Sequence, residues 1–158
     1  MPSFKNYKSY KGEYKPQNPN KYIGKNKPLY KSNLEHHFMK FCDLNDSIKY
    51  WQYEGFGIPY INPTKPNDGR NPNANYYPDF YIEYTDTKGN YHKAVIEIKS
   101  KNETNSPAPQ QRQTKKWLRE ALTYAVNESK WKQAKLFCES VGLEFMIVTE
   151  DFIKTHLV

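Results

Sequence analysis

The sequence predicts an α/β domain with a mixed central sheet that is flanked by helices. Apolar residues recur with helical spacing soon after residue 31 and again in the C-terminal third of the chain. Between these regions, segments rich in aromatic and β-branched residues alternate like strands and are separated by Gly, Pro and Asn. The 158 residues are enough for one domain with a substantial core.

The excess positive charge of the chain lies in an N-terminal arm. Residues 1–31 hold eight lysines and one acid, whereas residues 32–158 hold 16 basic and 16 acidic residues, so the net charge of +7 belongs to the arm. We therefore divide the chain into a basic, Tyr- and Pro-rich arm, 1–31, and a folded domain, 32–158. Arm lysines such as Lys21 and Lys31 suit contact with DNA, but a solvated tail or an arm that docks on protein is an open alternative.

The first half of the domain predicts one helix and then strands. Leu34, Phe38 and Phe41 share a helical face, and Ser32 is a suitable N-cap. Residues 47–61 predict one strand, or two that are broken around Gly55 and Gly57. We expect a loop over 62–75, and strands over 76–84 and 91–99 that form a hairpin through a turn at 85–90.

The second half predicts a loop, two helices and a final buried strand. The loop covers 102–110 and the first helix 111–126, and Asn127 is the expected N-cap of the second helix. The buried face of that helix is expected to carry Trp131, Ala134, Cys138 and Val141, and Gly142 is expected to end it. The strand covers 143–150. Cys42 and Cys138 both fall on apolar helix faces, which predicts small buried residues and no disulfide or zinc site.

Two acids and a lysine interrupt the predicted hairpin. Alternation along 91–99 directs Glu97 and Lys99 to the face opposite the core, and Asp79 follows Pro78 on the partner strand. Pairing through the turn brings Asp79 close to Glu97. Two adjacent carboxylates repel unless one is protonated or a cation joins them, and a hard divalent cation satisfies both. The alternative is a surface hairpin with an ordinary cross-strand ion pair.

This pattern resembles the signature of PD-(D/E)xK nucleases, since Pro78-Asp79 is followed after seventeen residues by Glu97-Ile98-Lys99. From Tyr14 to Asp151 the chain is similar to the small head-completion nucleases of T-even-type tailed bacteriophages, and more distantly to the endonuclease subunit of cut-and-paste transposons. The motifs that carry the similarity are Asn-Pro-x-Lys-Tyr at 18–22, Ile-Pro-Tyr at 58–60, Pro-Asp-Phe at 78–80, Glu-Ile-Lys at 97–99 and Lys-Trp-x-x-Ala at 130–134.

The resemblance implies a restriction-endonuclease-like core and a DNA endonuclease that depends on Mg²⁺, or on Mn²⁺ in its place. Asp79 and Glu97 would bind the metal, and Lys99 would act on the attacking water or on the phosphate. Family members often carry another acid on the first helix, and Glu35 matches its position as a third catalytic and metal-binding residue. Ser32-x-x-Glu35 is also a capping box, so a purely structural role is the alternative.

The resemblance also implies partners and a place in the virus. We expect double-stranded DNA and the phage head, portal or neck proteins as partners, no membrane and no small-molecule substrate, in a virion assembled in the host cytoplasm. Further expected DNA contacts are Lys101, Lys130 and Arg70, together with the two arm lysines. Two other functions stay open, a non-catalytic head-completion or portal-docking protein with a nuclease fold and a transposon-type endonuclease subunit.

Overall fold

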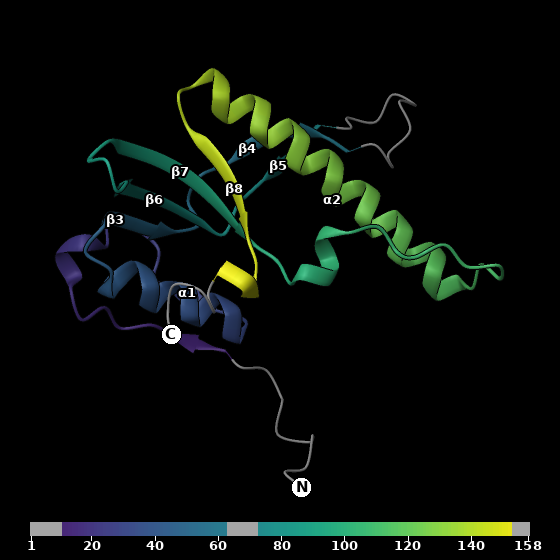
Figure 1. Cartoon of the computed structure of the whole chain (residues 1–158), viewed down its shortest axis with the longest axis horizontal. Coiled ribbons are helices and arrows are strands. Elements are labelled where there is room, and N and C mark those ends of the chain that lie inside the picture. The colour runs from purple at the N-terminus through teal and green to yellow at the C-terminus, as the bar shows by residue number, and fades with distance from the viewer. Residues whose placement is uncertain (1–10, 63–72, 153–158) are drawn as a thin grey trace, which may run out of the picture.

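The structure, a computed structural model, describes residues 11–62 and 73–152 (Figure 1). Its centre is a four-stranded sheet in the order β3-β6-β7-β8. β3 (Ile48–Tyr53) pairs antiparallel with β6 (Phe80–Thr85), β6 pairs antiparallel with β7 (Tyr91–Ile98), and β7 pairs parallel with β8 (Glu144–Val148). The predicted mixed sheet flanked by helices is therefore confirmed.

One helix packs on each face of this sheet. α1 (Asn33–Leu44) and α2 (Lys115–Ser140) contribute to separate hydrophobic clusters. Neighbouring residues of β7 point to different clusters, because Ala94 and Ile96 pack with α1 whereas Val95 packs with α2. The face of β7 that carries Glu97 is thus covered by α2, and it is not the solvent face of a simple hairpin.

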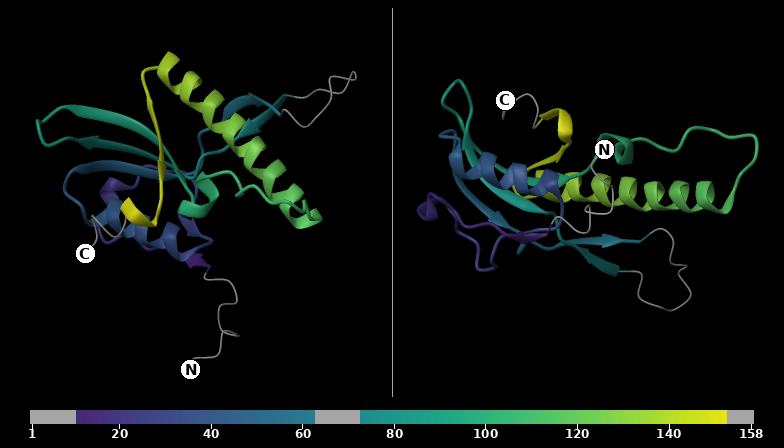
Figure 2. Two further views of the ribbon diagram at one scale, coloured as in Figure 1. Left: turned by 45° about the vertical axis from the view of Figure 1, so that its right-hand side comes forward. Right: turned by 90° about the horizontal axis from the view of Figure 1, so that it is seen from below.

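Short elements complete the chain. β1 (Gly12–Glu13) pairs with β2 (Leu29–Tyr30), and η2 (Pro19–Lys21) lies between them in the sequence. β4 (Ile58–Ile61) pairs with β5 (Asn73–Tyr76) in a hairpin that contacts α2. η3 (Lys101–Thr104) follows β7, after which the chain runs out along α2 and turns back into it (Figures 1 and 2). The start of α2 consequently extends beyond the sheet (Figure 2).

The prediction of one continuous strand over 76–84 is wrong, because two strands meet this range. Tyr76 ends β5 and Phe80 begins β6, and the predicted loop at 62–75 loses residues 73–75 to β5. The buried Pro78 lies between the two strands, and a proline has no N–H with which to continue a ladder. The break lets residues 73–76 pair with β4 while residues 80–85 join the central sheet. The split of 47–61 into two strands, by contrast, is confirmed.

The two predicted C-terminal helices are one. α2 is continuous from Lys115, with Thr114 as its N-cap, and Asn127 lies within it. A single asparagine costs a helix only about 0.7 kcal/mol, and no Gly or Pro interrupts residues 115–140. Trp131, Ala134 and Cys138 are buried as predicted, and Gly142 ends the helix with a positive φ, whereas Val141 is exposed.

Residues 11–31 lie against the domain, so a solvated tail does not describe this part of the arm. The buried carboxylate of Asp43 on α1 accepts hydrogen bonds from the Tyr14 hydroxyl (2.6 Å) and from two arm amides, those of Gln17 and Asn18. Burial opposes ionisation of Asp43, but these hydrogen bonds outweigh it and lower its pKa. The Lys21 ammonium donates to the carbonyls of Asp43 and Asn45 and so caps α1.

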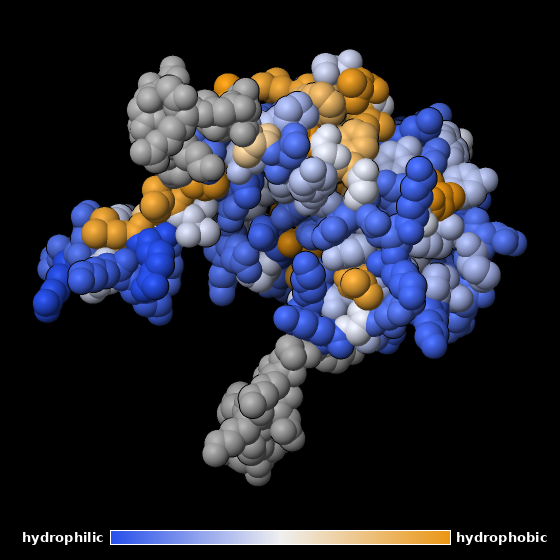
Figure 3. Space-filling view, turned by 180° about the vertical axis from the view of Figure 1, so that it is seen from behind, coloured by the Kyte–Doolittle hydropathy of each residue, from blue (hydrophilic) through white to orange (hydrophobic). Residues whose placement is uncertain are grey.

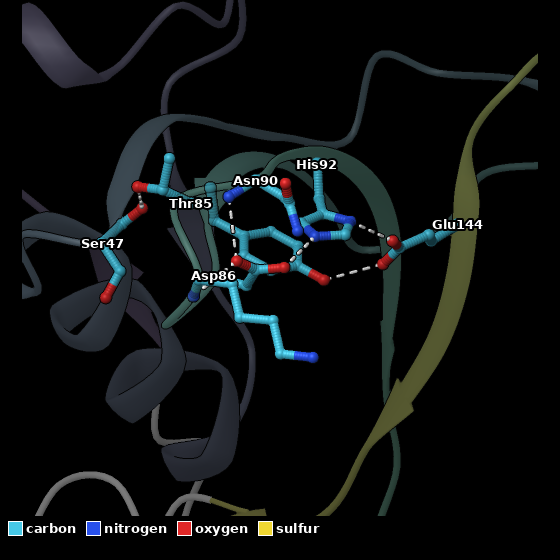
Figure 4. A network of polar contacts seen from close by, with 8 residues as sticks. Ser47, Thr85, Asp86, Asn90, His92 and Glu144 are labelled. Atoms are coloured by element: carbon cyan, nitrogen blue, oxygen red, sulfur yellow. Dashed lines mark hydrogen bonds and ion pairs between the residues drawn. The ribbon is translucent and has the colours of Figure 1, made fainter.

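A polar network fixes the other end of the β6–β7 hairpin (Figure 4). His92 lies between Asp86 of the turn, at 2.7 Å, and Glu144 at the start of β8, at 2.6 Å. Tyr84 stacks on the His92 ring and donates to the second oxygen of Glu144. The two carboxylates raise the pKa of His92, and the hydrogen bond from His92 lowers that of Asp86 to about 2. The network joins β6, β7 and β8 at the end of the hairpin opposite to Asp79 and Glu97.

Candidate active site

The register of β6 and β7 places the two predicted acids together. Phe80 pairs with Ile96, so one step further along the antiparallel strands Asp79 faces Glu97. The Asp79 carboxylate accepts a hydrogen bond from the Ile98 amide at 2.8 Å, and its own carbonyl accepts one from the Glu54 amide at 2.9 Å. Glu54 has a positive φ of 50°, an uncommon conformation for a residue with a side chain. Asp79 is held from both sides of its strand.

Glu97 is buried, with only 7% of its surface exposed. One carboxylate oxygen accepts a hydrogen bond from the Tyr76 hydroxyl at 2.5 Å, and the other lies 3.7 Å from the Lys99 ammonium. Lys99 also lies 3.6 Å from a carboxylate oxygen of Glu103 in η3. The structure therefore brings Asp79, Glu97 and Lys99 together, as the sequence predicts.

The pKa values of both acids are raised, so the pair favours a protonated form. Burial and the negative charge of Glu97 raise the pKa of Asp79 to about 8, against the opposing effects of the Ile98 amide and Lys99. Burial also raises the pKa of Glu97, although the hydrogen bond from Tyr76 and the charges of Lys99 and Lys130 oppose the rise. Without a cation, the pair is therefore unfavourable in its doubly ionised form.

Tyr76 is a member of the site that sequence reasoning missed. It reaches Glu97 from β5, outside the central sheet, and its pKa is raised far above its usual range by burial and by the charge of Glu97, so it remains a donor. The Lys130 ammonium lies 5.4 Å from the centre of the Tyr60 ring and 5.7 Å from that of Tyr76. No local pattern marks Tyr76, because its role depends on the β4–β5 hairpin folding back over β7.

The sequence predicts that Glu35 either completes a capping box or binds the metal, and its contacts match neither role fully. The Ser32 hydroxyl accepts a hydrogen bond from the Glu35 amide at 3.1 Å, which confirms the N-cap. The Glu35 carboxylate, however, accepts from the Lys31 amide at 3.1 Å and not from Ser32 as a regular capping box would have it. Its negative charge contributes to the raised pKa of Asp79. The Glu35 carboxylate is therefore bound to the backbone at the start of α1, near enough to Asp79 for its charge to add to the raised pKa.

The predicted DNA contacts lie in different settings. The Lys101 ammonium is exposed but 3.1 Å from Asp151, and Lys130 lies over two tyrosine rings beside Glu97. Lys21 is occupied with the end of α1, so we do not propose it as a DNA contact. Lys31 donates its amide to Glu35 at the start of α1, and Arg70 lies outside the described residues.

The donor set fits a hard divalent cation. Asp79 and Glu97 supply carboxylate oxygens, the donors that Mg²⁺ prefers, and each has lone pairs beyond its hydrogen bonds. Over residues 11–62 and 73–152, no three His, Cys, Asp or Glu side chains gather closely enough to enclose a metal. A two-carboxylate site suits Mg²⁺, which usually keeps several waters and substrate phosphates among its ligands.

Fold and site together define a nuclease of the restriction-endonuclease-like class. Residues 45–150 match the family model of the TnsA-like endonuclease N-terminal domain, a segment that includes Asp79, Glu97 and Lys99. The chain is also 34% identical over 151 residues to the head completion nuclease of Enterobacteria phage T4, an alignment that covers 92% of this chain and 95% of that protein. The chain belongs to the TnsA-like endonuclease family. No solved structure matches it significantly.

The described helices include none with the length and apolarity that a membrane crossing requires.

The first prediction concerns the cost of the buried acids. A carboxyl whose pKa is raised on folding binds more protons in the folded state, so stability falls as pH rises from about 4 to about 8. Asp79→Asn keeps an acceptor for the Ile98 amide but removes this penalty. In chelator at pH 8, we expect its free energy of unfolding to exceed that of the wild type by at least about 1 kcal/mol, and the difference to vanish below pH 4.

Chemical denaturation at several pH values measures this difference, and adding Mg²⁺ supplies the control. The cation should stabilise the wild type and not Asp79→Asn, because only the wild type offers the second carboxylate. A variant that is less stable than the wild type at pH 8 in chelator would contradict the electrostatic account.

The second prediction separates the two roles of Glu35. Glu35→Gln retains an acceptor for the Lys31 amide, so we expect a melting temperature close to that of the wild type. It removes a negative charge that acts on Asp79, so we expect weaker Mn²⁺ binding in calorimetric titration. An unchanged Mn²⁺ affinity would restrict Glu35 to the helix terminus.

Proposed function

We propose that the chain is a Mg²⁺-dependent endodeoxyribonuclease that hydrolyses phosphodiester bonds during phage head completion, and that Mn²⁺ can replace Mg²⁺. The observation that carries this proposal is the buried carboxylate pair of Asp79 and Glu97 with the Lys99 ammonium 3.7 Å from Glu97. We propose double-stranded DNA as the substrate. Membership of the endonuclease family does not by itself specify the nucleic acid, so the substrate has to be tested.

The residues of the site have separate tasks in this proposal. Asp79 and Glu97 would hold the cation, with Glu35 adding negative charge nearby. When bound, the cation would polarise the phosphate and favour ionisation of an attacking water. Lys99 orients that water or neutralises charge that develops on the phosphate oxygens. Tyr76 holds one oxygen of Glu97 in place, so the other oxygen faces Lys99.

Similarity to the T4 protein supports the biological setting. We propose that the chain acts on DNA in the filled phage head, meets portal or neck proteins there, and stays in the virion after assembly in the host cytoplasm. Lys31, Lys101 and Lys130 are the described lysines that we retain as DNA contacts, and Arg70 remains a proposal outside the described residues. A transposon-type endonuclease subunit is the alternative that the TnsA-like family model raises, but that model matches residues 45–150 whereas the T4 relative aligns with 92% of the chain, which supports the phage setting.

A non-catalytic portal-docking protein is the main alternative. The site argues against it, because a structural protein gains nothing from two carboxylates that bury charge next to each other. Removing a pair of this kind would raise the stability of a protein that did not use it for chemistry.

The test is cleavage of supercoiled and linear plasmid DNA by the purified protein, with Mg²⁺ or with chelator. We expect cleavage only with the metal, and a loss of about 100-fold or more in Glu97→Gln and Lys99→Met, because each variant removes a group that acts in the transition state. Lys88→Met, in the distant turn of the hairpin, is the matched control and should cleave like the wild type. Equal cleavage by wild type and Lys99→Met would overturn the assignment.

A further inference from the structure

A groove runs beside the candidate active site. It measures about 800 Å³ and lies between the first half of α2 on one side and η3 with the segment after it on the other. Its walls are formed by Asn102, Glu103, Asn105, Ser106, Pro107 and Ala108 on one side and by Lys116, Arg119, Glu120, Thr123, Tyr124 and Asn127 on the other. The Trp117 indole donates to the Ala108 carbonyl at 2.8 Å and so fixes one wall to the other.

One residue of the groove wall, Glu103, contacts Lys99. The Glu103 carboxylate lies 3.6 Å from the Lys99 ammonium, which in turn lies 3.7 Å from Glu97. Glu103 therefore links the groove wall to the lysine of the candidate active site. Figure 2 shows the same segment and the start of α2 extending together beyond the sheet.

The segment that carries this groove has an excess of positive charge, whereas the groove lining itself holds two basic residues, Lys116 and Arg119, and two acidic residues, Glu103 and Glu120. Residues 99–120 contain six basic and two acidic residues, although residues 32–158 as a whole are balanced. Glu103 pairs with Lys99, and Glu120 pairs with Lys116 at 3.8 Å, so Lys116 would exchange Glu120 for a phosphate when DNA binds. Seen from behind, the projecting part of the molecule is mainly hydrophilic with some apolar surface (Figure 3). Leu118 and Leu122 of α2 are both exposed. This surface suits an anionic polymer.

The inner lining suits bases as well as phosphates. Asn102, Asn105 and Asn127 supply side-chain amides that both donate and accept hydrogen bonds, and Tyr124 supplies an aromatic ring. Proteins bind unpaired nucleotides through this combination of basic groups along the backbone and rings that stack on bases. A duplex would present its phosphates to the groove and keep its bases stacked inside, so the amides and the ring would have no base to contact.

We propose that this groove binds a single-stranded stretch of the DNA substrate next to the scissile phosphate, with Lys116 and Arg119 on the phosphates and Tyr124 against a base. The inference rests on the proposed nuclease function and names its substrate class, DNA with an unpaired extension at the site of cleavage. Such a substrate is bound more tightly than a blunt duplex because the groove adds contacts that the duplex cannot make.

Fluorescence anisotropy in chelator tests the proposal without cleavage, with a duplex that carries a ten-nucleotide extension and a blunt duplex of the same length. We expect the wild type to bind the extended duplex about tenfold more tightly. Lys116→Ala combined with Arg119→Ala should abolish this preference. It should also flatten the slope of log affinity against log salt by about 1.4, for two lost contacts to a single strand.

Lys132→Ala combined with Lys135→Ala is the matched control, since it removes the same charge from the same helix outside the groove. It should keep the preference for the extended duplex. An equal loss in this control, or a wild type without the preference, would overturn the groove assignment. The plasmid assay separates the proposed nuclease function from the proposed groove. A wild type that cleaves DNA but does not prefer the extended duplex would refute only the groove.

A crosslinking experiment locates the strand directly. The chain has two cysteines, Cys42 and Cys138, and both are buried, so Asn105→Cys introduces an exposed thiol into the groove. We expect it to form a disulfide with DNA that carries a tethered thiol on the unpaired extension and not with the same tether within the duplex. Ser140→Cys, at the far end of α2, is the control. Equal yields for Asn105→Cys and Ser140→Cys on the extended DNA would overturn the proposal.

Discussion

The arrangement of the site depends on one electrostatic constraint, the burial of Asp79 against Glu97 across the β6–β7 pair. Their register makes the two carboxylates neighbours, and the Ile98 amide and the Tyr76 hydroxyl hold them there. These hydrogen bonds keep the acids adjacent, and the resulting repulsion favours a form that retains a proton, unless a cation joins the two carboxylates. In our proposal the affinity for a divalent cation would follow from how the hairpin is held, since the charge that destabilises the metal-free protein would be the charge that binds the metal.

The rest of the fold supplies what the pair lacks. α2 covers the face of β7 that carries Glu97, which removes water and brings Lys130 near the site. The break at Pro78 sends β5 to a separate hairpin, and only from that hairpin does Tyr76 reach Glu97. Asp43 binds residues 14–18 of the arm to α1, the helix that carries Glu35. Each neighbouring element therefore positions one group around the same two carboxylates.

The sequence predicts those parts of the fold that depend on local periodicity and turn chemistry. Alternation along 91–99 correctly separates Ile96 from Glu97, and the turn at 85–90 pairs the strands so that Asp79 meets Glu97. Contacts between distant segments escape this reasoning. From the sequence, Tyr76 is predicted as the start of a strand, Asn127 as a helix boundary and Lys21 as a DNA contact. Tertiary contacts override the local signal at Tyr76 and Lys21, and at Asn127 the low cost of one asparagine lets the helix continue.

Anomalous diffraction from crystals soaked in Mn²⁺ tests the central claim most directly. The protein used must cleave DNA in the same metal, so that the observed ion is the one that supports activity. Our account predicts an anomalous peak coordinated by carboxylate oxygens of both Asp79 and Glu97, with the Tyr76 hydroxyl still on Glu97. A peak bound by other residues, or Asp79 and Glu97 without a metal in a protein that cleaves DNA, would contradict it.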